Sequence, residues 1–93
     1  TKEETKAQNR TDEIVKLLSL NKYEALKVYE AILAKEKKIT VLKEEHKYNK
    51  ETFKAKMKVL TKATNRVMKD FLGGESMQKI HAHFRAKREN YKK

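Results

Sequence analysis

Apolar residues recur along this chain at the spacing expected for α-helices. The first apolar group covers residues 14–18. It follows Thr11, a residue type that caps helix starts, and two acidic residues, which are favoured in a first turn. We therefore predict a short first helix from Thr11 to about Leu20. Residues 1–10 are expected to form an N-terminal arm that either frays or continues this helix.

Capping patterns bound two longer apolar stretches. Asn21 is followed three positions later by Glu24, as in a capping box, and apolar residues then continue at helical spacing to about His46. Asn49 offers another cap, and Gly73 supplies a stop of the kind that ends helices. These features predict two helices of similar length. The apolar stripe of the second comprises Phe53, Met57, Leu60, Thr64, Val67 and Phe71.

The last part of the chain has the pattern of a basic amphipathic helix. Ser76 can cap it, and Met77, Ile80, Phe84 and Tyr91 fall on one face. The chain has no proline and only two glycines, and it is rich in good helix formers. We predict an all-α fold: a small bundle of three to four helices, in which a short first and a basic last helix complete a long helical hairpin. This single domain covers residues 11–91, and residues 92–93 fray.

Apolar residues spaced seven apart raise the alternative of one long coiled-coil rod. They run at this interval from Leu18 to Val67. The companion positions of such a heptad include Lys35 and Lys56, and fewer than half of them are apolar. A continuous apolar seam is therefore missing. We prefer a hairpin that turns near residues 46–49.

The expected core follows from the apolar faces of the predicted helices. Residues 39–42, Ile-Thr-Val-Leu, contain three β-branched residues and could form a short strand or a break. Their flanks are helix-like, so we expect the helix to continue. In this core, Leu60→Ala would cost about 2–5 kcal/mol. The expected core residues are Leu18, Leu26, Ile32, Leu33, Phe53, Leu60, Val67, Phe71, Ile80 and Phe84.

Charge is distributed unevenly between the two halves of the chain. The sequence carries 24 Lys or Arg and 13 Asp or Glu residues, a net charge of +11. Residues 1–45 are nearly neutral, whereas residues 46–93 carry fourteen cations against four acids, a net charge of +10. Residues 52–69 hold six cations and no acid. Such a concentration of positive charge is typical of surfaces that bind nucleic acid or another polyanion.

Five cations in this half are spaced four residues apart and would follow one another along a helix. At a rise of about 1.5 Å per residue they span about 24 Å. Like charges at this spacing cost about 0.2–0.5 kcal/mol per pair, a penalty that interleaved acids would avoid. We expect these residues to contact an anion, although a lysine-rich face can also serve solubility alone. This set, named the cation row, comprises Lys50, Lys54, Lys58, Lys62 and Arg66.

The predicted function is binding of nucleic acid through its phosphate backbone, with RNA and DNA both open. Lysine is a compact point charge without the forked geometry of arginine, which suits phosphates better than base edges. The alternative is a protein-interaction module that docks an acidic or phosphorylated protein within a larger complex. Further predicted contacts outside the cation row are Lys69, Lys79, Arg85, Lys87 and Arg88.

Side chains that carry catalysis or hold metals are scarce. His81 and His83 would point to opposite sides of a helix, so we predict no metal site. Cysteine is absent, serine occurs only at Ser19 and Ser76, and the Gly73–Gly74 pair is not a phosphate-binding loop. No apolar run reaches the roughly 20 residues that span a bilayer. We therefore predict a non-enzymatic protein without a cofactor, located inside the cell and not bound to a membrane.

Overall fold

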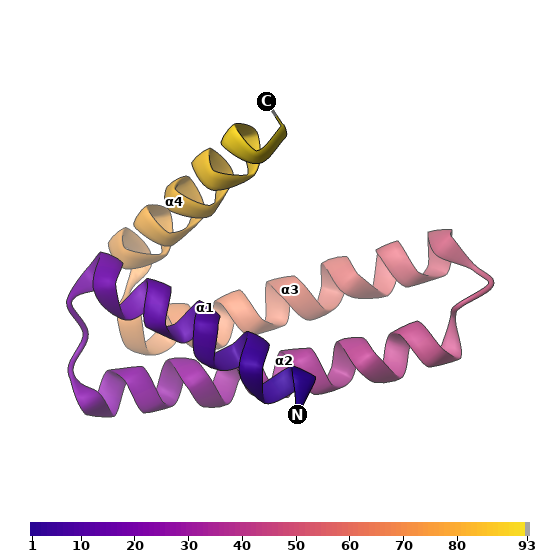
Figure 1. The fold of residues 1–93 in the computed structure, drawn as a ribbon, viewed down its shortest axis with the longest axis horizontal. Helices are drawn as coiled ribbons and strands as arrows, with labels where there is room; N and C mark the ends of the chain where they lie inside the picture. The colour runs from indigo at the N-terminus through magenta and orange to yellow at the C-terminus, as the bar shows by residue number, and fades with distance from the viewer. Residues whose placement is uncertain (93) are drawn as a thin grey trace.

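Four α-helices account for almost all of the chain that the structure describes. The structure is a computed structural model that describes residues 1–92, with side chains through Asn90. Within these residues there is no strand, so the predicted all-α fold is confirmed. The expectations for the Tyr91 side chain and for Lys93 lie outside the described part. The helices are α1 (Lys2–Leu18), α2 (Lys22–Glu45), α3 (Lys50–Leu72) and α4 (Gly74–Lys92), as Figure 1 shows.

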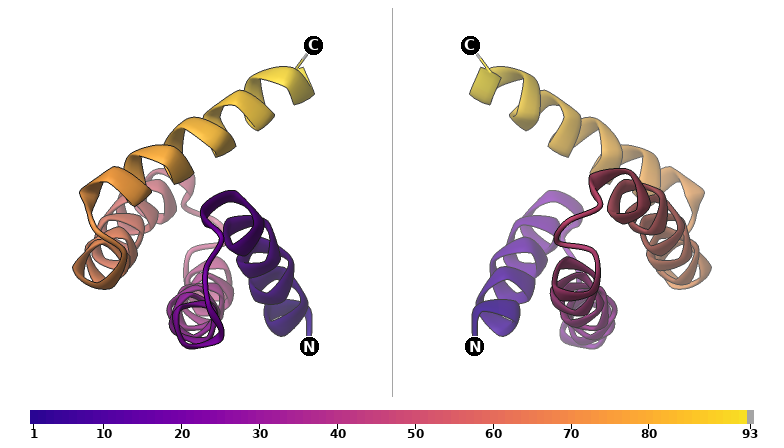
Figure 2. Two further views of the ribbon diagram at one scale, coloured as in Figure 1. Left: turned by 90° about the vertical axis from the view of Figure 1, so that its left-hand side faces the viewer. Right: turned by 90° about the vertical axis from the view of Figure 1, so that its right-hand side faces the viewer.

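The helices α2 and α3 run antiparallel and form the predicted long hairpin (Figure 1). The helix α1 packs obliquely across α2, while α4 leaves the end of α3, approaches α1 and then extends away from the hairpin. The end-on views in Figure 2 place α1 and α4 on one side of the hairpin. The molecule measures 40 × 31 × 24 Å. One face of the hairpin is thus covered by the other two helices, and its opposite face stays open.

The helix α1 begins at the start of the chain rather than at Thr11. Thr1 and Glu4 form a capping box, in which the Glu4 N–H donates to the Thr1 hydroxyl oxygen at 3.2 Å. Thr11 lies inside α1, is 2% exposed and donates its hydroxyl hydrogen bond to the Ala7 carbonyl oxygen at 2.7 Å. The predicted cap at Thr11 is wrong because the pattern at Thr1 and Glu4 starts the helix earlier.

Residues 2–10 are an integral part of the bundle. Ala7 is fully buried, which anchors the first half of α1 in the core. Thr40 in α2 donates a hydrogen bond from its hydroxyl to the carboxylate of Glu3 at 2.9 Å. Of the two outcomes expected for the N-terminal arm, the structure therefore shows continuation of the first helix.

The other helix boundaries follow local sequence signals with one exception. Asn21 and Asn49 cap α2 and α3 through their side chains, as predicted. Gly73 ends α3 with a φ of 89°, a positive value that glycine adopts freely because it has no Cβ. The predicted cap at Ser76 is wrong, because α4 starts two residues earlier and the N–H of Met77 donates to the Gly73 carbonyl at 3.2 Å. A single glycine therefore separates the two helices.

Both alternatives to the predicted hairpin are excluded by the course of the backbone. The chain reverses between Glu45 and Lys50, so α2 and α3 are two helices and not one rod. Residues 39–42 lie within α2 and form neither a strand nor a break. The structure therefore has the hairpin and the uninterrupted helix that the sequence predicted.

The buried core is shared by all four helices and is small. Ile32 and Ile80 are buried as predicted, and Phe53 and Leu60 are only half-buried. Around the core pack Leu18, Leu33, Phe71 and Phe84, which are also partly buried. The buried apolar residues are Ala7, Ile14, Val28, Ile32, Met68, Met77 and Ile80.

Two residues of the expected core, Leu26 and Val67, are 55% and 53% exposed. In the predicted apolar stripe of α3, Leu60 was followed by Val67 seven residues later, which corresponds to two turns of 3.5 residues each. A straight α-helix completes a turn every 3.6 residues rather than every 3.5, so the inward position shifts to Met68, which is buried. In α2, apolar residues lie on several sides of the helix, and periodicity alone does not identify Val28 as the buried one.

Packing differs along the length of the hairpin. None of residues 37–60 is buried, and we call this segment the distal half of the hairpin. The proximal half, where α1 and α4 pack, contains Val28, Ile32 and Met68. Apart from the contact of Thr40 with Glu3 in α1, the distal half is therefore a two-helix projection with a large exposed surface.

Candidate polyanion-binding site

The cation row is exposed along its whole length on α3. Successive members are about 6 Å apart along the helix axis and are rotated by about 40° from one another. Over the four steps from Lys50 to Arg66 the rotation reaches about 160°, so the two ends of the row point in nearly opposite directions. Three or four consecutive members can therefore face one ligand. The row winds around α3 instead of forming a straight edge.

No acidic side chain neutralises the cation row within the described residues. The ion pairs in this part of the chain do not involve any member of the row. Lys69, the other predicted contact on α3, is also exposed. The positive charge of α3 is thus available to an external anion.

The predicted contacts on α4 fall into three situations. Lys79 is exposed, whereas Arg85 and Arg88 line a cleft between the helices. Lys87 donates a hydrogen bond from Nζ to Oε1 of Glu13 in α1 at 2.7 Å. Oε2 of Glu13 lies 2.8 Å from Nε2 of His83. Lys87 therefore already has an anionic partner inside the chain.

Hydrogen bonds change the acidity of Glu13. The bond from Lys87, followed by the contact with His83, holds the pKa of this carboxyl below its usual value. Its side chain is 32% exposed, so solvent screens part of this interaction. The cluster joins α1 to α4 and explains why one of the predicted contacts on α4 is structural.

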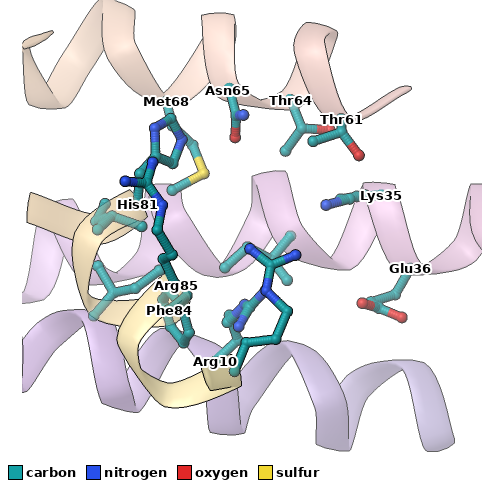
Figure 3. A pocket seen from close by; sticks show the side chains of 14 residues that line it. Arg10, Lys35, Glu36, Thr61, Thr64, Asn65, Met68, His81, Phe84 and Arg85 are labelled. Atoms are coloured by element: carbon teal, nitrogen blue, oxygen red, sulfur yellow. The ribbon is translucent and has the colours of Figure 1, made fainter. Parts of the chain in front are cut away.

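The cleft has a volume of about 300 Å³ and is lined by residues of all four helices (Figure 3). Two of its cations, Arg10 and Lys35, were not predicted as site residues because they lie in the nearly neutral half of the chain. One signal was available: Lys35 lies between Ile32 and Ile39 on the inward side of α2. A lysine at such a position faces the interior of a bundle rather than solvent.

Arg10 and Lys35 lie close enough to interact in this cleft, where Lys35 is half-buried and Arg10 keeps more of its surface exposed. The Arg10 guanidinium lies over the Phe84 ring, 3.8 Å from its centroid. Burial lowers the pKa of Arg10, opposed by Glu13 and Glu36, and the charge of Arg88 lowers it further. Burial also lowers the pKa of Lys35, and the Arg10 charge adds to this effect. The two cations are therefore near enough to repel each other, and part of each is removed from water.

An apolar groove lies on the open face of the hairpin. It has a volume of about 450 Å³ and is also lined by Lys38 and Lys56. Val41 and Val59 are 53% and 70% exposed, which is unusual for residues of this type. Its apolar residues are Val41, Leu42, Val59, Leu60 and Ala63.

The two histidines of α4 lie apart, as predicted. His81 lines the cleft, whereas His83 contacts Glu13. Among the described residues no group of three His, Cys, Asp or Glu side chains could hold a metal ion. In the same part of the chain, no helix combines the length and the apolar character needed to cross a bilayer.

Comparison of the chain with known protein families, with curated proteins and with solved structures found no match.

Proposed function

We propose that this protein is a small basic module that binds nucleic acid through its phosphate backbone. The observation that carries this proposal is the cation row on α3, which is exposed and has no acidic partner among the described residues. Lys54, Lys56 and Lys58 lie in the distal half of the hairpin, which projects from the core and can approach an extended ligand.

Lysines at this spacing match the chemistry of a phosphate backbone. Neutralising each phosphate releases condensed counterions, so affinity falls as salt rises. Because the row winds around α3, only about four of its five cations can reach one ligand. The logarithm of affinity for duplex DNA should then fall against the logarithm of salt concentration with a slope of about −3 to −4. Recognition of backbone rather than base edges predicts little preference for sequence.

The test compares charge reversals on the two helices of the hairpin. The variant Lys58→Glu/Lys62→Glu should lower duplex affinity at least about tenfold and flatten the salt slope by about two units. The matched control Lys37→Glu/Lys43→Glu makes the same charge change at exposed positions of α2 and should keep the parent slope within about one unit. Equal losses in both variants would show that only net charge matters, and an unchanged row variant would assign the row to solubility.

The groove on the open face favours a second candidate function. Its apolar walls and its two lysines, Lys38 and Lys56, suit an acidic amphipathic helix of a protein partner. Val59→Glu should abolish binding of such a helix and leave duplex binding within about twofold of the parent. Val67→Glu, which makes the same change at an exposed position outside the groove, is the control. If neither variant alters binding of an acidic helix, this candidate is excluded.

A further inference from the structure

Four cations from three helices converge on the cleft described above. Arg10 comes from α1, Lys35 from α2, and Arg85 and Arg88 from α4. The acid that lines the cleft is Glu36. Figure 3 shows Arg10 and Lys35 directed into the same space, whereas Arg85 extends along another wall toward His81 and Met68. The cleft therefore has an excess of positive charge in a concave site, unlike the convex surface of α3.

These charges form no close ion pair within the described part of the chain. None of its ion pairs involves the four cleft cations. Thr61 and Asn65 project from α3 toward the cations in Figure 3. The hydrogen bonds between described side chains leave the Thr61 hydroxyl and the Asn65 amide free. Both groups are therefore able to donate to a ligand from the opposite wall.

One of the four cations, Arg10, is also held in place before any ligand arrives. Stacking on Phe84 fixes the guanidinium of Arg10. Burial is the main cause that lowers the pKa of both Arg10 and Lys35. The charge of Arg10 adds to this effect at Lys35, and the charge of Arg88 adds to it at Arg10, although Glu36 opposes both shifts. Converging like charges destabilise the empty cleft, and a bound anion would remove this penalty. Glu36 alone is too little to balance four cations.

We propose that the cleft binds the phosphate monoester group of a compact ligand. A phosphate monoester carries a charge of about −1.5 to −2 at neutral pH, which matches a site with a net excess of about three cations. Arginine forks bind phosphate oxygens in pairs, and Thr61 and Asn65 can complete the set of donors. A volume of about 300 Å³ is sufficient for a small organic phosphate.

The other walls accommodate the organic part of such a ligand. Ile14, Ile32, Met68 and Ile80 are buried residues that also line the cleft. They form an apolar floor with little accessible surface, and the partly buried Phe84 ring also lines the cleft. Apolar groups next to a few charged ones are the usual composition of small-molecule sites. This proposal does not rest on nucleic-acid binding by the cation row, because it uses a different set of residues.

The experiment is isothermal titration of the full chain with adenosine 5′-monophosphate, with adenosine as the control that lacks the phosphate. We expect saturable one-to-one binding of the nucleotide with a dissociation constant below about 1 mM and no measurable binding of adenosine. Equal binding of both probes, or no saturable binding of the nucleotide, would overturn the proposal.

Two matched variants of α2 identify the site. Lys35→Gln should weaken nucleotide binding about tenfold, whereas Lys37→Gln, at an exposed position of the same helix, should bind like the parent. Arg88→Gln gives a second test at an exposed residue if Lys35→Gln proves unfolded by circular dichroism. Equal affinities of Lys35→Gln, Arg88→Gln and Lys37→Gln would overturn the assignment.

A variant that gains affinity excludes a general loss of structure as the explanation. Glu36→Gln removes the acid that faces the cleft, so nucleotide binding should strengthen by about threefold or more. Weaker nucleotide binding in this variant would contradict the proposal that the positive charge of the cleft attracts the phosphate. The row variant Lys58→Glu/Lys62→Glu should retain nucleotide binding, which separates failure of this proposal from failure of the proposed function.

The source of the phosphate is resolved by a second pair of probes. A free nucleotide and the 5′ end of a nucleic acid both carry a phosphate monoester. A short oligonucleotide with a 5′-phosphate should bind more tightly than the same oligonucleotide with a 5′-hydroxyl if the end enters the cleft, and Lys35→Gln should remove the difference. If the two oligonucleotides bind equally while the mononucleotide still binds, the cleft serves a free small ligand. Both results support a phosphate monoester site.

Discussion

The two ends of the α2–α3 hairpin are built differently. At the proximal end, Val28, Ile32 and Met68 are buried under α1 and α4. In the distal half, none of residues 37–60 is buried, and residues such as Ile39 and Met57 are half-exposed. Both ends belong to the same two helices, so helix formation alone does not require a packed core at every turn.

This difference separates stability from surface chemistry. The distal half relies on local devices, such as the Asn49 cap of α3, and on good helix formers. Few of its side chains are constrained by packing, so it can carry a series of like charges and an exposed apolar groove. The proximal half supplies the buried apolar surface that holds the bundle together. Variants at matched positions can measure how complete this division is.

The largest effect is expected at Ile32. Ile32→Ala should lower the free energy of unfolding by about 2–5 kcal/mol, because it opens a cavity in the shared core. Ile39→Ala makes the same change seven residues later on α2, where the side chain is half-buried, and should cost less than about 2 kcal/mol. Urea denaturation of both variants checks this difference. Equal losses would mean that the distal half contributes as much packing as the proximal half.

A smaller effect is expected at Leu60. The sequence pattern placed Leu60 in the core and predicted a loss of about 2–5 kcal/mol on truncation. Leu60 is half-buried and lines the open groove, so Leu60→Ala should cost only about 1–2 kcal/mol. Met68→Ala, in the proximal half of the same helix, should cost about 2–5 kcal/mol and serves as the comparison. A loss at Leu60 as large as that at Met68 would contradict the division.

The error at Leu60 shows which parts of the fold can be predicted from sequence. Caps at Asn21 and Asn49 and the stop at Gly73 depend on residues a few positions apart, and all three were predicted correctly. The depth of burial depends on which helices cover which turn. Nothing near Leu60 in the sequence indicates that α1 and α4 leave this turn uncovered.

The candidate sites show the same limit. Exposure of the cation row could be predicted because its spacing is a property of one helix. The cleft could not, because Arg10 and Lys35 meet Arg85 only after three helices pack together. A charge count along the chain adds Arg10 and Lys35 to neighbouring acids, so the segments that contain them have almost no net charge. The inward position of Lys35 on α2 was the one local sign of this arrangement.

Charge reversal in the cation row should have little effect on stability. Lys58→Glu/Lys62→Glu should leave the free energy of unfolding within about 1 kcal/mol of the parent, or raise it, because acids in the row relieve repulsion between neighbouring cations. Thermal melts followed by circular dichroism provide the measurement. If the variant lost several kcal/mol, these lysines would be part of the packing, and this part of α3 would not be a free surface. The control Lys37→Glu/Lys43→Glu is expected to behave similarly, since α2 already alternates lysine with glutamate.

The smallest effect concerns the ion pair that joins α1 to α4. Glu13→Gln removes the partner of Lys87 and His83 and should cost about 0.2–1 kcal/mol at pH 7, because both side chains of the Glu13–Lys87 pair are partly exposed. The pKa of Glu13 is lowered in the folded chain, so its contribution is present above the pKa of the unfolded chain, about 4.3. It is lost as the pH falls through the lowered folded pKa. The stability difference between Glu13→Gln and the parent should therefore disappear in strong acid.

Glu30→Gln, at an exposed position outside the ion pairs of the described residues, is the matched control for the change in net charge. If the difference at Glu13 persisted at low pH, or if Glu30→Gln reproduced it, the contact between α1 and α4 would not depend on this carboxylate.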